Sequence, residues 1–237
     1  MSEGLISIVL PVRNQADHIA EIVEEYEAAL AKLPRPHETI LVVNSPRDNS
    51  WQLCQKLPDR YPHIRALHSQ KAGWGLAVKL GLSEARGELL CYTNSARTTG
   101  QDLTLLLLYA SVWPKVVVKA NRKIRESWRR RLGSLLYNLE CRALFDLNVW
   151  DINGTPKVFP RNFTRLLQLT RDDDLVDAEF LVQCRRANYP VLEVPIFSSR
   201  RHGGKSTTGL RSAARMYWGA WSLRRALARQ AGEAATP

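Results

Sequence analysis

Apolar residues recur along this chain in two periods, and the order of those periods predicts the fold. Residues 5–10, 38–43 and 88–93 are largely continuous apolar runs, which is typical of strands buried on both faces of a parallel sheet. Residues 16–33 and 73–87 carry apolar side chains at helical spacing instead. Strands that alternate with helices at such intervals indicate right-handed βαβ units and a mostly parallel sheet.

The second half of the chain has shorter strands between longer helices. A strand in "KVVVKANRK" leads into an arginine-rich amphipathic helix at about 127–146, and a C-terminal helix is expected over 209–229. The last residues, 230–237, are expected to be disordered, as chain ends often are. The other expected elements are a helix at 51–57, a strand at 63–69, strands within 155–161 and 190–200, and a helix at about 177–188.

The charge of the chain is uneven. Its 34 Lys and Arg exceed its 23 Asp and Glu and give a formal net charge of +11. Residues 115–142 hold nine basic and two acidic residues, and residues 198–237 hold eight and one, so the excess lies in two patches. Such patches suit a phosphate-bearing ligand, nucleic acid or an anionic membrane face. A merely solvated basic surface is the alternative.

The cysteines and apolar runs indicate the compartment. Cys54, Cys91, Cys141 and Cys184 lie far apart in apolar segments, without the spacing of a zinc site or redox pair, which predicts reduced core thiols in a cytoplasmic protein. No basic region precedes a long apolar run at the N-terminus, so no signal peptide is expected. The longest apolar run, 103–113, is too short to cross a bilayer. Any membrane association is therefore expected to be peripheral, on the cytoplasmic face.

Two loops carry candidate nucleotide-binding residues. Pro11 stops the first expected strand, and Arg13 and Asn14 follow where they could hydrogen-bond a base and a phosphate; Asn14 could instead cap the next helix. Gly73 and Gly75 permit close approach of a ligand to a helix N-terminus, which favours anions, and a tight turn is the alternative. The candidates in these loops are Pro11, Arg13, Asn14, Lys71, Gly73 and Gly75.

Five stretches, in this order, resemble the family-2 glycosyltransferases of the GT-A fold: "SIVLPVRNQADHI", "ETILVVNSPRDNS", "KAGWGLAVKLGLSEARGELLCY", "VWDINGTPKVFPRNF" and "DAEFLVQCRRANYPVLEVPI". The most similar branch is that of the polyprenyl-phosphate sugar transferases, including dolichyl-phosphate mannose synthase-like enzymes. The resemblance implies a Rossmann-like three-layer α/β sandwich with a mostly parallel central sheet over residues 1–210. An amphipathic helix and a disordered tail are expected over 211–237.

The resemblance breaks where the family holds its divalent metal. Two aspartates that the family usually carries after its second strand align with Val43 and Asn44, which leaves only Asp48 downstream. The Asp-x-Asp of the family aligns with "NSA", residues 94–96. Because Mg²⁺ and Mn²⁺ need oxygen ligands with negative charge, the resemblance implies that the usual metal site is absent or severely weakened. No cofactor is expected.

Two explanations of this loss stay open. In the first, the fixed cations Arg13, Lys71 and Arg97 replace the metal and neutralise the donor diphosphate. In the second, the chain is a pseudoenzyme that binds a sugar nucleotide or acts as a scaffold. The further donor-side residues that the resemblance implies are Asn44, Asp48, Asn94, Ser95 and Arg97.

The resemblance also implies an acceptor side. Asp151, Asp177 and Glu179 are candidate catalytic acids, although Asp177 could instead cap a helix. A hydroxyl acceptor needs a base, whereas a phosphate acceptor is already anionic. An arginine cluster matches the zone where this branch binds a lipid phosphate, and a solvated helix face is its alternative. The implied acceptor-side residues are Arg122, Arg125, Arg129, Arg130, Arg131, Asn153, Lys157, Arg200, Arg201, Lys205 and Ser206.

Together these features predict an inverting glycosyltransferase that moves a sugar from a nucleotide-diphospho-sugar to a polyprenyl phosphate or another acceptor, with weak or no metal dependence. Trp218 and Trp221 in the C-terminal helix suit a peripheral contact with an anionic membrane, and core packing is their alternative. The inactive pseudoenzyme is the first rival. Nucleic-acid binding by the basic patches is the second, and no recognised nucleic-acid motif supports it.

Overall fold

One seven-stranded sheet organises the chain. This computed structural model describes the backbone of residues 4–123, 128–197 and 210–233, and the side chains at 128–130, 210–215 and 229–233 lie outside the description. The strands are β1 (Ile6–Val12), β2 (His37–Asn44), β3 (Ile64–Ser69), β4 (Leu89–Tyr92), β5 (Val117–Arg122), β6 (Lys157–Pro160) and β7 (Val191–Ile196).

The helices fill the intervals between the strands. They are α1 (Ile19–Leu30), α2 (Ser50–Arg60), α3 (Trp74–Glu84), α4 (Gly100–Val112), α5 (Trp128–Phe145), α6 (Val176–Arg186) and α7 (Leu210–Glu233), with a short 3₁₀ turn at Thr164–Leu167. The predicted helices correspond to α1, α2, α3, α5, α6 and α7. Helix α4 was not predicted, although the Thr99 side chain accepts a hydrogen bond from Asp102 N and caps its first turn.

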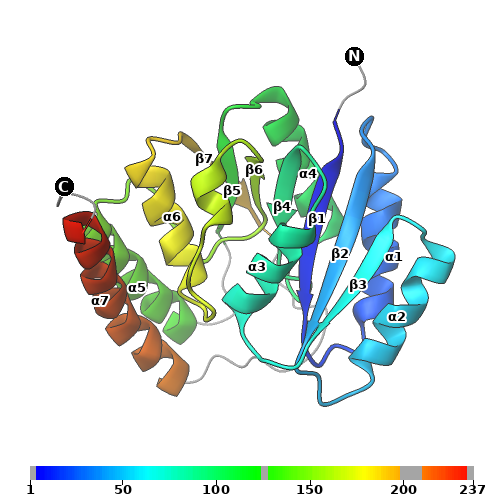
Figure 1. The fold of residues 1–237 in the computed structure, drawn as a ribbon, viewed down its shortest axis with the longest axis horizontal. Helices are drawn as coiled ribbons and strands as arrows, with labels where there is room; N and C mark the ends of the chain where they lie inside the picture. Colours follow the sequence, from blue (N-terminus) through cyan, green and yellow to red (C-terminus); the bar gives the residue numbers. More distant parts are fainter. Residues whose placement is uncertain (1–3, 124–127, 198–209, 234–237) are drawn as a thin grey trace.

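The strand order of this sheet is β3-β2-β1-β4-β6-β5-β7, and β6 is the one antiparallel member. Strands β1, β2 and β4 are those predicted at 5–10, 38–43 and 88–93, and β1 pairs in parallel with both of the others. The mostly parallel sheet is therefore confirmed. Because β3, β2, β1 and β4 are parallel neighbours, the loops that follow them meet at one edge, which lies at the bottom of Figure 1.

Two hydrophobic cores lie on the two faces of the sheet and make the three layers (Figure 1). Helices α1, α2 and α4 cover one face, whereas α3, α5, α6 and α7 cover the other. The predicted three-layer sandwich is confirmed. All four cysteines are buried and unpaired, as the sequence predicts.

Helix α7 is part of this core. Its side chains Ala220, Leu223 and Leu227 are buried in the core that α3 and α6 share. The helix extends to Glu233, so the expectation of disorder from residue 230 is wrong for 230–233, while 234–237 lie outside the described residues. Among the described residues, no helix combines the length and apolar character needed to cross a bilayer.

We expect opposite effects from alanine at two helical glycines. A Cβ at Gly81 in α3 would lie 2.2 Å from Val9 Cγ1, so Gly81→Ala should lower the free energy of unfolding by about 1–3 kcal/mol. A Cβ at Gly133 in α5 meets nothing within 4 Å, so Gly133→Ala should raise it by about 0.5–1 kcal/mol. Urea unfolding of both variants measures the difference, and equal shifts would contradict this packing of α3 on β1.

Candidate functional site

The loop after β1 is fastened to the loop after β2. Gln15 N donates to Ser50 Oγ (2.8 Å), and Ala16 N donates to Asp48 Oδ2 (3.0 Å). Asp48 also accepts from the backbone and hydroxyl of Ser50. Burial raises the pKa of Asp48, but these hydrogen bonds outweigh it and leave the pKa below its ordinary value. Asp48 therefore organises the edge as an ionised loop anchor.

Asn14 lies in the loop after β1 with φ +52°, and its Oδ1 accepts from Arg47 N (2.8 Å). The helix-cap alternative for Asn14 is wrong, because His18 occupies the N-cap position of α1. Arg13 and Asn14 are both exposed at this edge, whereas Pro11 is buried at the end of β1. A ligand that lies over the loop can reach both exposed side chains.

Cations surround the edge. Arg13 follows β1, Arg47 follows β2 and Lys71 follows β3, and all three side chains are exposed. Arg97, after β4, is partly exposed. Sequence reasoning missed Arg47, which could have been recognised because it follows the second buried strand as closely as the chosen candidates follow theirs. This arrangement favours a ligand with several negative charges.

Two buried polar atoms at the edge have no hydrogen-bond partner among the described residues. Asn44 Nδ2 donates to Gly73 O (2.7 Å), but Asn44 Oδ1 accepts nothing. His18 Nδ1 is paired with Asp17, while His18 Nε2 has no partner. Buried polar atoms are almost always satisfied, so such exceptions favour a site that a ligand completes.

Gly73, just before α3, and Gly75, within it, lie against a neighbouring backbone segment. A Cβ at Gly73 would lie 2.4 Å from Asp172 O, and a Cβ at Gly75 would lie 2.3 Å from Arg171 O. Leu76 N donates to the same Asp172 carbonyl (3.0 Å). These glycines therefore permit close approach of the 171–173 backbone, and their contact with a ligand stays a prediction.

The turn after β4 lacks the carboxylates of a Mg²⁺ or Mn²⁺ site. Asn94 Oδ1 accepts from Ala96 N (2.9 Å), and Ser95 Oγ donates to Gln15 Oε1 (2.5 Å). Thr93 and Thr98 bond each other through their hydroxyls (2.7 Å). The side-chain oxygens of this turn hold the turn and its neighbours together, and a hard divalent cation does not fit this donor set.

A buried ion pair joins β6 to α6 beside this turn. Lys157 Nζ donates to Asp177 Oδ1, which also accepts from Tyr92 Oη (2.9 Å), and Trp74 Nε1 donates to Asp177 Oδ2 (3.0 Å). Burial lowers the pKa of Lys157 to about 8, although Asp177 opposes the shift. Asp177 and Lys157 thus bind each other in the core, and their expected roles as a catalytic acid and an acceptor ligand stay predictions. The cap alternative is wrong, because Leu175 holds the N-cap position of α6.

Asp151 has a comparable partner. Arg122 donates to Asp151 Oδ2 through Nε (2.7 Å) and through its backbone N (2.9 Å), and to Oδ1 through Nη2 (2.8 Å). The two side chains thereby bind each other, and their expected roles as a catalytic acid and a phosphate ligand stay predictions. Asn153 lies two residues further, and its buried Oδ1 has no partner among the described residues. Asn153 therefore remains a candidate ligand residue.

Glu179 holds the 170–171 segment. Its carboxylate accepts from the backbone N and hydroxyl of Thr170 (3.0 and 2.7 Å) and from Arg171 N (2.9 Å). The side chain is 1% exposed. Glu179 therefore positions the segment that packs on Gly73 and Gly75, and its expected role as a catalytic acid stays a prediction.

Much of the predicted acceptor side cannot be placed. Arg131 is exposed in the first turns of α5. The other predicted residues of the arginine cluster and of the following basic loop lie outside the described side chains; they are Arg125, Arg129, Arg130, Arg200, Arg201, Lys205 and Ser206.

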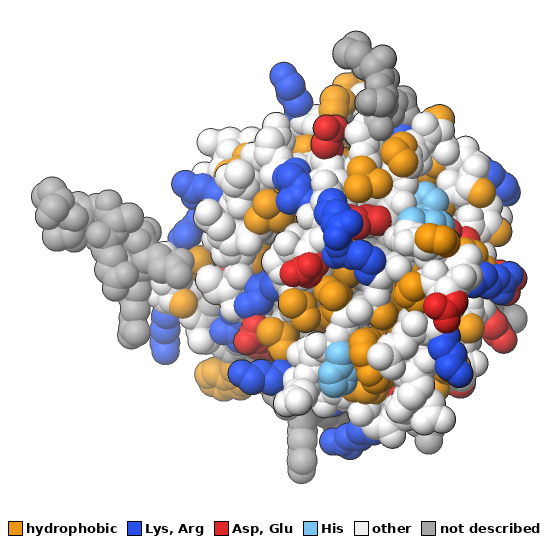
Figure 2. Space-filling view, turned by 45° about the vertical axis from the view of Figure 1, so that its right-hand side comes forward, with side chains coloured by type: hydrophobic (Ala, Val, Ile, Leu, Met, Phe, Trp, Pro, Cys, Tyr) orange, Lys and Arg blue, Asp and Glu red, His pale blue; other side chains and the backbone are white. Residues whose placement is uncertain are grey.

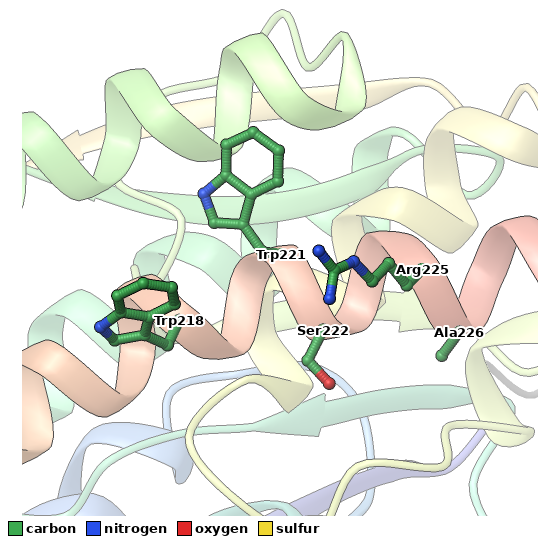
Figure 3. A pocket seen from close by; sticks show the side chains of 5 residues that line it. All are labelled: Trp218, Trp221, Ser222, Arg225 and Ala226. Carbon is green, nitrogen blue, oxygen red and sulfur yellow. The ribbon is translucent and has the colours of Figure 1, made fainter.

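Helices α5 and α7 lie side by side (Figure 1), and both expose large apolar side chains. Tyr217 Oη of α7 donates to Gly133 O of α5 (2.7 Å). Trp218 is 79% exposed and Trp221 is 49% exposed, and with Arg225 they line a groove of about 610 Å³ (Figure 3). The core-packing alternative for these tryptophans is therefore wrong. Helix α5 also exposes four leucines at helical spacing, Leu132, Leu135, Leu136 and Leu139.

Comparison with known proteins gives the family and its relatives. The model of the family described as glycosyl transferase family 2 matches residues 7–165. The undecaprenyl-phosphate 4-deoxy-4-formamido-L-arabinose transferase of Pseudomonas paraeruginosa is 25% identical over 171 residues, 71% of this chain and 50% of that protein. The protein of the same name from Pectobacterium atrosepticum is 30% identical over 162 residues, 66% of this chain and 49% of that protein. The chain thus spans about half the length of the curated relatives it matches.

Solved structures with the same fold include glucosyl-3-phosphoglycerate synthase from Mycobacterium tuberculosis in complex with Mn²⁺, UDP and phosphoglyceric acid. That structure has a TM-score of 0.70 and 16% identity, and the match covers 93% of this chain and 78% of that chain. The same synthase with Mn²⁺, UDP and glucosyl-3-phosphoglycerate has a TM-score of 0.71 at 16% identity, over 93% and 80% of the two chains. The likeness confirms the predicted GT-A fold.

We expect Lys157→Met to change how stability depends on pH. Because the folded pKa of Lys157 is about 8 against an ordinary 10.5, the unfolded chain binds more protons than the folded chain between those values. The free energy of unfolding of the wild type should therefore rise from pH 8 to pH 10, by up to about 2–3 kcal/mol from this group. Urea unfolding at both pH values should show a smaller rise in Lys157→Met.

Tyr92→Phe is the control for this experiment. It removes one hydrogen bond to Asp177 and keeps the ammonium group, so it should lower stability by about 1 kcal/mol at both pH values and preserve the rise. An identical pH dependence in the wild type and Lys157→Met would contradict the depressed pKa.

Proposed function

The chain belongs to glycosyl transferase family 2, and on that premise we propose that it transfers a sugar from a nucleoside-diphospho-sugar to a polyprenyl phosphate. The observation that carries the proposal is the carboxyl edge of β1, β2, β3 and β4, where a cation follows each strand and two buried polar atoms have no partner among the described residues. The names of the relatives, which are undecaprenyl-phosphate sugar transferases, support this acceptor class.

The nucleoside of the donor lies over the loops after β1 and β2 in this proposal. Asn44 Oδ1 accepts a hydrogen bond from a base N–H or a ribose hydroxyl. Asn14 is exposed in the loop after the neighbouring strand β1. His18 Nε2 offers a second buried contact. The protein would therefore recognise the nucleoside through neutral groups, although the family usually has aspartates at the end of β2.

The diphosphate is held by fixed cations. Arg13, Arg47, Lys71 and Arg97 follow four adjacent parallel strands, so their charges face a ligand at one edge. Arginine bonds phosphate through several donors at once, and lysine supplies a point charge. These cations neutralise the leaving nucleoside diphosphate, a role for which the turn at 94–96 has no metal-binding carboxylate.

The transfer step is a direct displacement. A phosphate oxygen of the acceptor attacks the anomeric carbon, and the bond from that carbon to the donor phosphate oxygen breaks. The nucleoside diphosphate leaves with the electron pair of this bond. Attack from the opposite side inverts the anomeric configuration. A phosphate acceptor is already anionic and needs no general base. This agrees with the engagement of Asp151 by Arg122 and of Asp177 by Lys157.

The acceptor reaches the site from a membrane surface. Leu136 and its neighbours on α5, with Trp218 and Trp221 on α7, provide apolar side chains for the lipid interface, and the exposed Arg131 and Arg225 suit anionic head groups. Peripheral association with the cytoplasmic face would place this surface next to the polyprenyl phosphate.

We expect Lys71→Ala and Arg97→Ala to weaken donor binding roughly 10–100-fold each, because each removes a charge-assisted contact to the diphosphate. Binding is measured by isothermal titration with the nucleoside diphosphate that gives the largest thermal shift in a panel. Lys115→Ala is the matched control, because Lys115 is exposed and precedes β5, at the opposite edge. Equal losses in Lys115→Ala would contradict the placement of the diphosphate.

We expect chelator to leave donor binding and turnover nearly unchanged in the wild type, because the turn after β4 holds no carboxylate. Asn94→Asp combined with Ala96→Asp should create Mn²⁺ binding at this turn, measured by the paramagnetic broadening of nucleotide signals. Loss of wild-type activity with chelator would contradict the replacement of the metal by cations. Donor binding without turnover of any acceptor would favour the pseudoenzyme. The hydrogen bonds that Asp151 and Asp177 already accept within the protein also agree with that alternative.

We expect Trp218→Ser to weaken binding to anionic phospholipid vesicles about tenfold, because a tryptophan at the interface contributes roughly 1.5–3 kcal/mol of apolar burial. Vesicle co-sedimentation with anionic and with neutral lipid measures the effect. Trp113→Ser is the control, since Trp113 is 54% exposed after α4, on the other face of the sheet. Equal binding of both variants and the wild type would contradict the membrane surface, and salt-dependent binding of unrelated oligonucleotides would favour the nucleic-acid rival.

A further inference from the structure

A second group of polar side chains lies at the opposite, amino edge of the sheet. Glu27 comes from α1, His37 is the first residue of β2, and His63 directly precedes β3. Asn44 ends β2, so the cluster and the proposed donor site are separated by about 23 Å, at roughly 3.3 Å of strand per residue. The cluster is therefore independent of the proposed function.

Three potential ligand atoms converge in this cluster. Glu27 Oε2 lies 2.6 Å from His63 Nε2 and 3.4 Å from His37 Nε2, and all three atoms lie within 4.8 Å of one another. The two imidazole rings meet edge to face, with their centroids 4.7 Å apart. Two imidazole nitrogens and a carboxylate oxygen are thus gathered from three separate elements.

The hydrogen bonds within the cluster leave one potential metal ligand, a carboxylate oxygen, unused. Glu27 Oε1 is buried and has no hydrogen-bond partner among the described residues, although a carboxylate that is buried normally has both oxygens satisfied. The Glu27 side chain is 12% exposed, while that of His63 is 37% exposed, so solutes reach the cluster from the His63 side. In the view of Figure 2, histidine side chains reach the surface of the molecule.

The carboxylate is ionised, as a metal ligand must be. A metal would displace the proton that lies between Glu27 and His63, because a ligand atom binds a metal through its lone pair.

We propose that Glu27, His37 and His63 bind a first-row divalent cation, with Zn²⁺ as the best match. Zinc takes imidazole nitrogen at about 2.0–2.1 Å and carboxylate oxygen at about 2.0–2.2 Å, so neighbouring ligand atoms of a tetrahedral site lie about 3.3–3.4 Å apart. The separation of Glu27 and His37 already has this value. The separation of Glu27 and His63 must widen as the metal replaces the proton between them.

The ion would act as a structural cross-link. It would join helix α1 to the start of β2 and to the segment that enters β3, which are three separate parts of the N-terminal half of the fold. Glu27 Oε1 or a water molecule completes the coordination. A cluster held only by hydrogen bonds would need no ion, and zinc would then leave its stability unchanged.

The test measures zinc binding and thermal unfolding of the full chain after removal of metals with chelator. Competition with a chromophoric chelator should give one high-affinity Zn²⁺ per chain in the absence of nucleotide. At free zinc about 100-fold above the dissociation constant, the midpoint of unfolding should rise by about 5–10 °C. Absence of this binding or of this shift in the wild type would overturn the proposal, whatever the variants do.

Variants then locate the site. Glu27→Gln and His63→Gln should each weaken zinc binding about 100-fold or more and abolish the thermal shift, and the unfolding midpoint without metal shows that each variant is folded. His68→Gln is the matched control, because His68 is exposed on β3 and outside the cluster, and it should bind zinc as the wild type does. Bound Co²⁺ should show the visible absorption of a tetrahedral site in the wild type and His68→Gln. Unchanged zinc affinity in both cluster variants would overturn the assignment.

Discussion

The buried ion pair between Lys157 and Asp177 is the contact on which the architecture of the second half depends. It joins the antiparallel strand β6 to helix α6, and the same carboxylate binds Tyr92 of β4 and Trp74 at the start of α3. Removing two charges from water costs several kcal/mol, which only well-placed donors offset. Four elements therefore meet at this carboxylate, where Lys157 at the start of β6 lies opposite Tyr92 at the carboxyl end of β4.

Several acidic side chains in the second half of the sheet form ion pairs with buried or partly buried cations, whereas other basic side chains are exposed. Asp177, Asp151 and Glu193 are each paired with a cation of the sheet, namely Lys157, Arg122 and Lys119. Since these partners neutralise one another, they add little net charge to this region. The exposed Arg13, Arg47 and Lys71 after β1, β2 and β3 add positive charge to the edge that also holds Asp48.

Glycine has a structural role at the junction of the two halves. Gly73 and Gly75 let the backbone of 171–173 approach α3, and Glu179 holds that backbone from α6. Contacts of this kind join the carboxyl edge of the first strands to the second half of the chain. The two edges of the sheet differ in the same way: hydrogen-bonded loops and cations at one, and a compact Glu–His–His cluster at the other.

The periodicity of apolar residues was sufficient to predict the parallel sheet, the layers and most helices, because burial of a strand or helix face depends on residues near in sequence. It missed α4, whose apolar residues lack a clear stripe, and it placed α1 before its actual start. The structure places the candidate cations Arg13 and Lys71 after parallel strands at one edge, and their role there stays a prediction. The roles of Asp177, Glu179, Lys157 and Arg122 could not be predicted in this way. Trp74 and Tyr92 lie 103 and 85 positions from Asp177, so only the tertiary structure decides whether such a carboxylate faces a substrate or a buried cation.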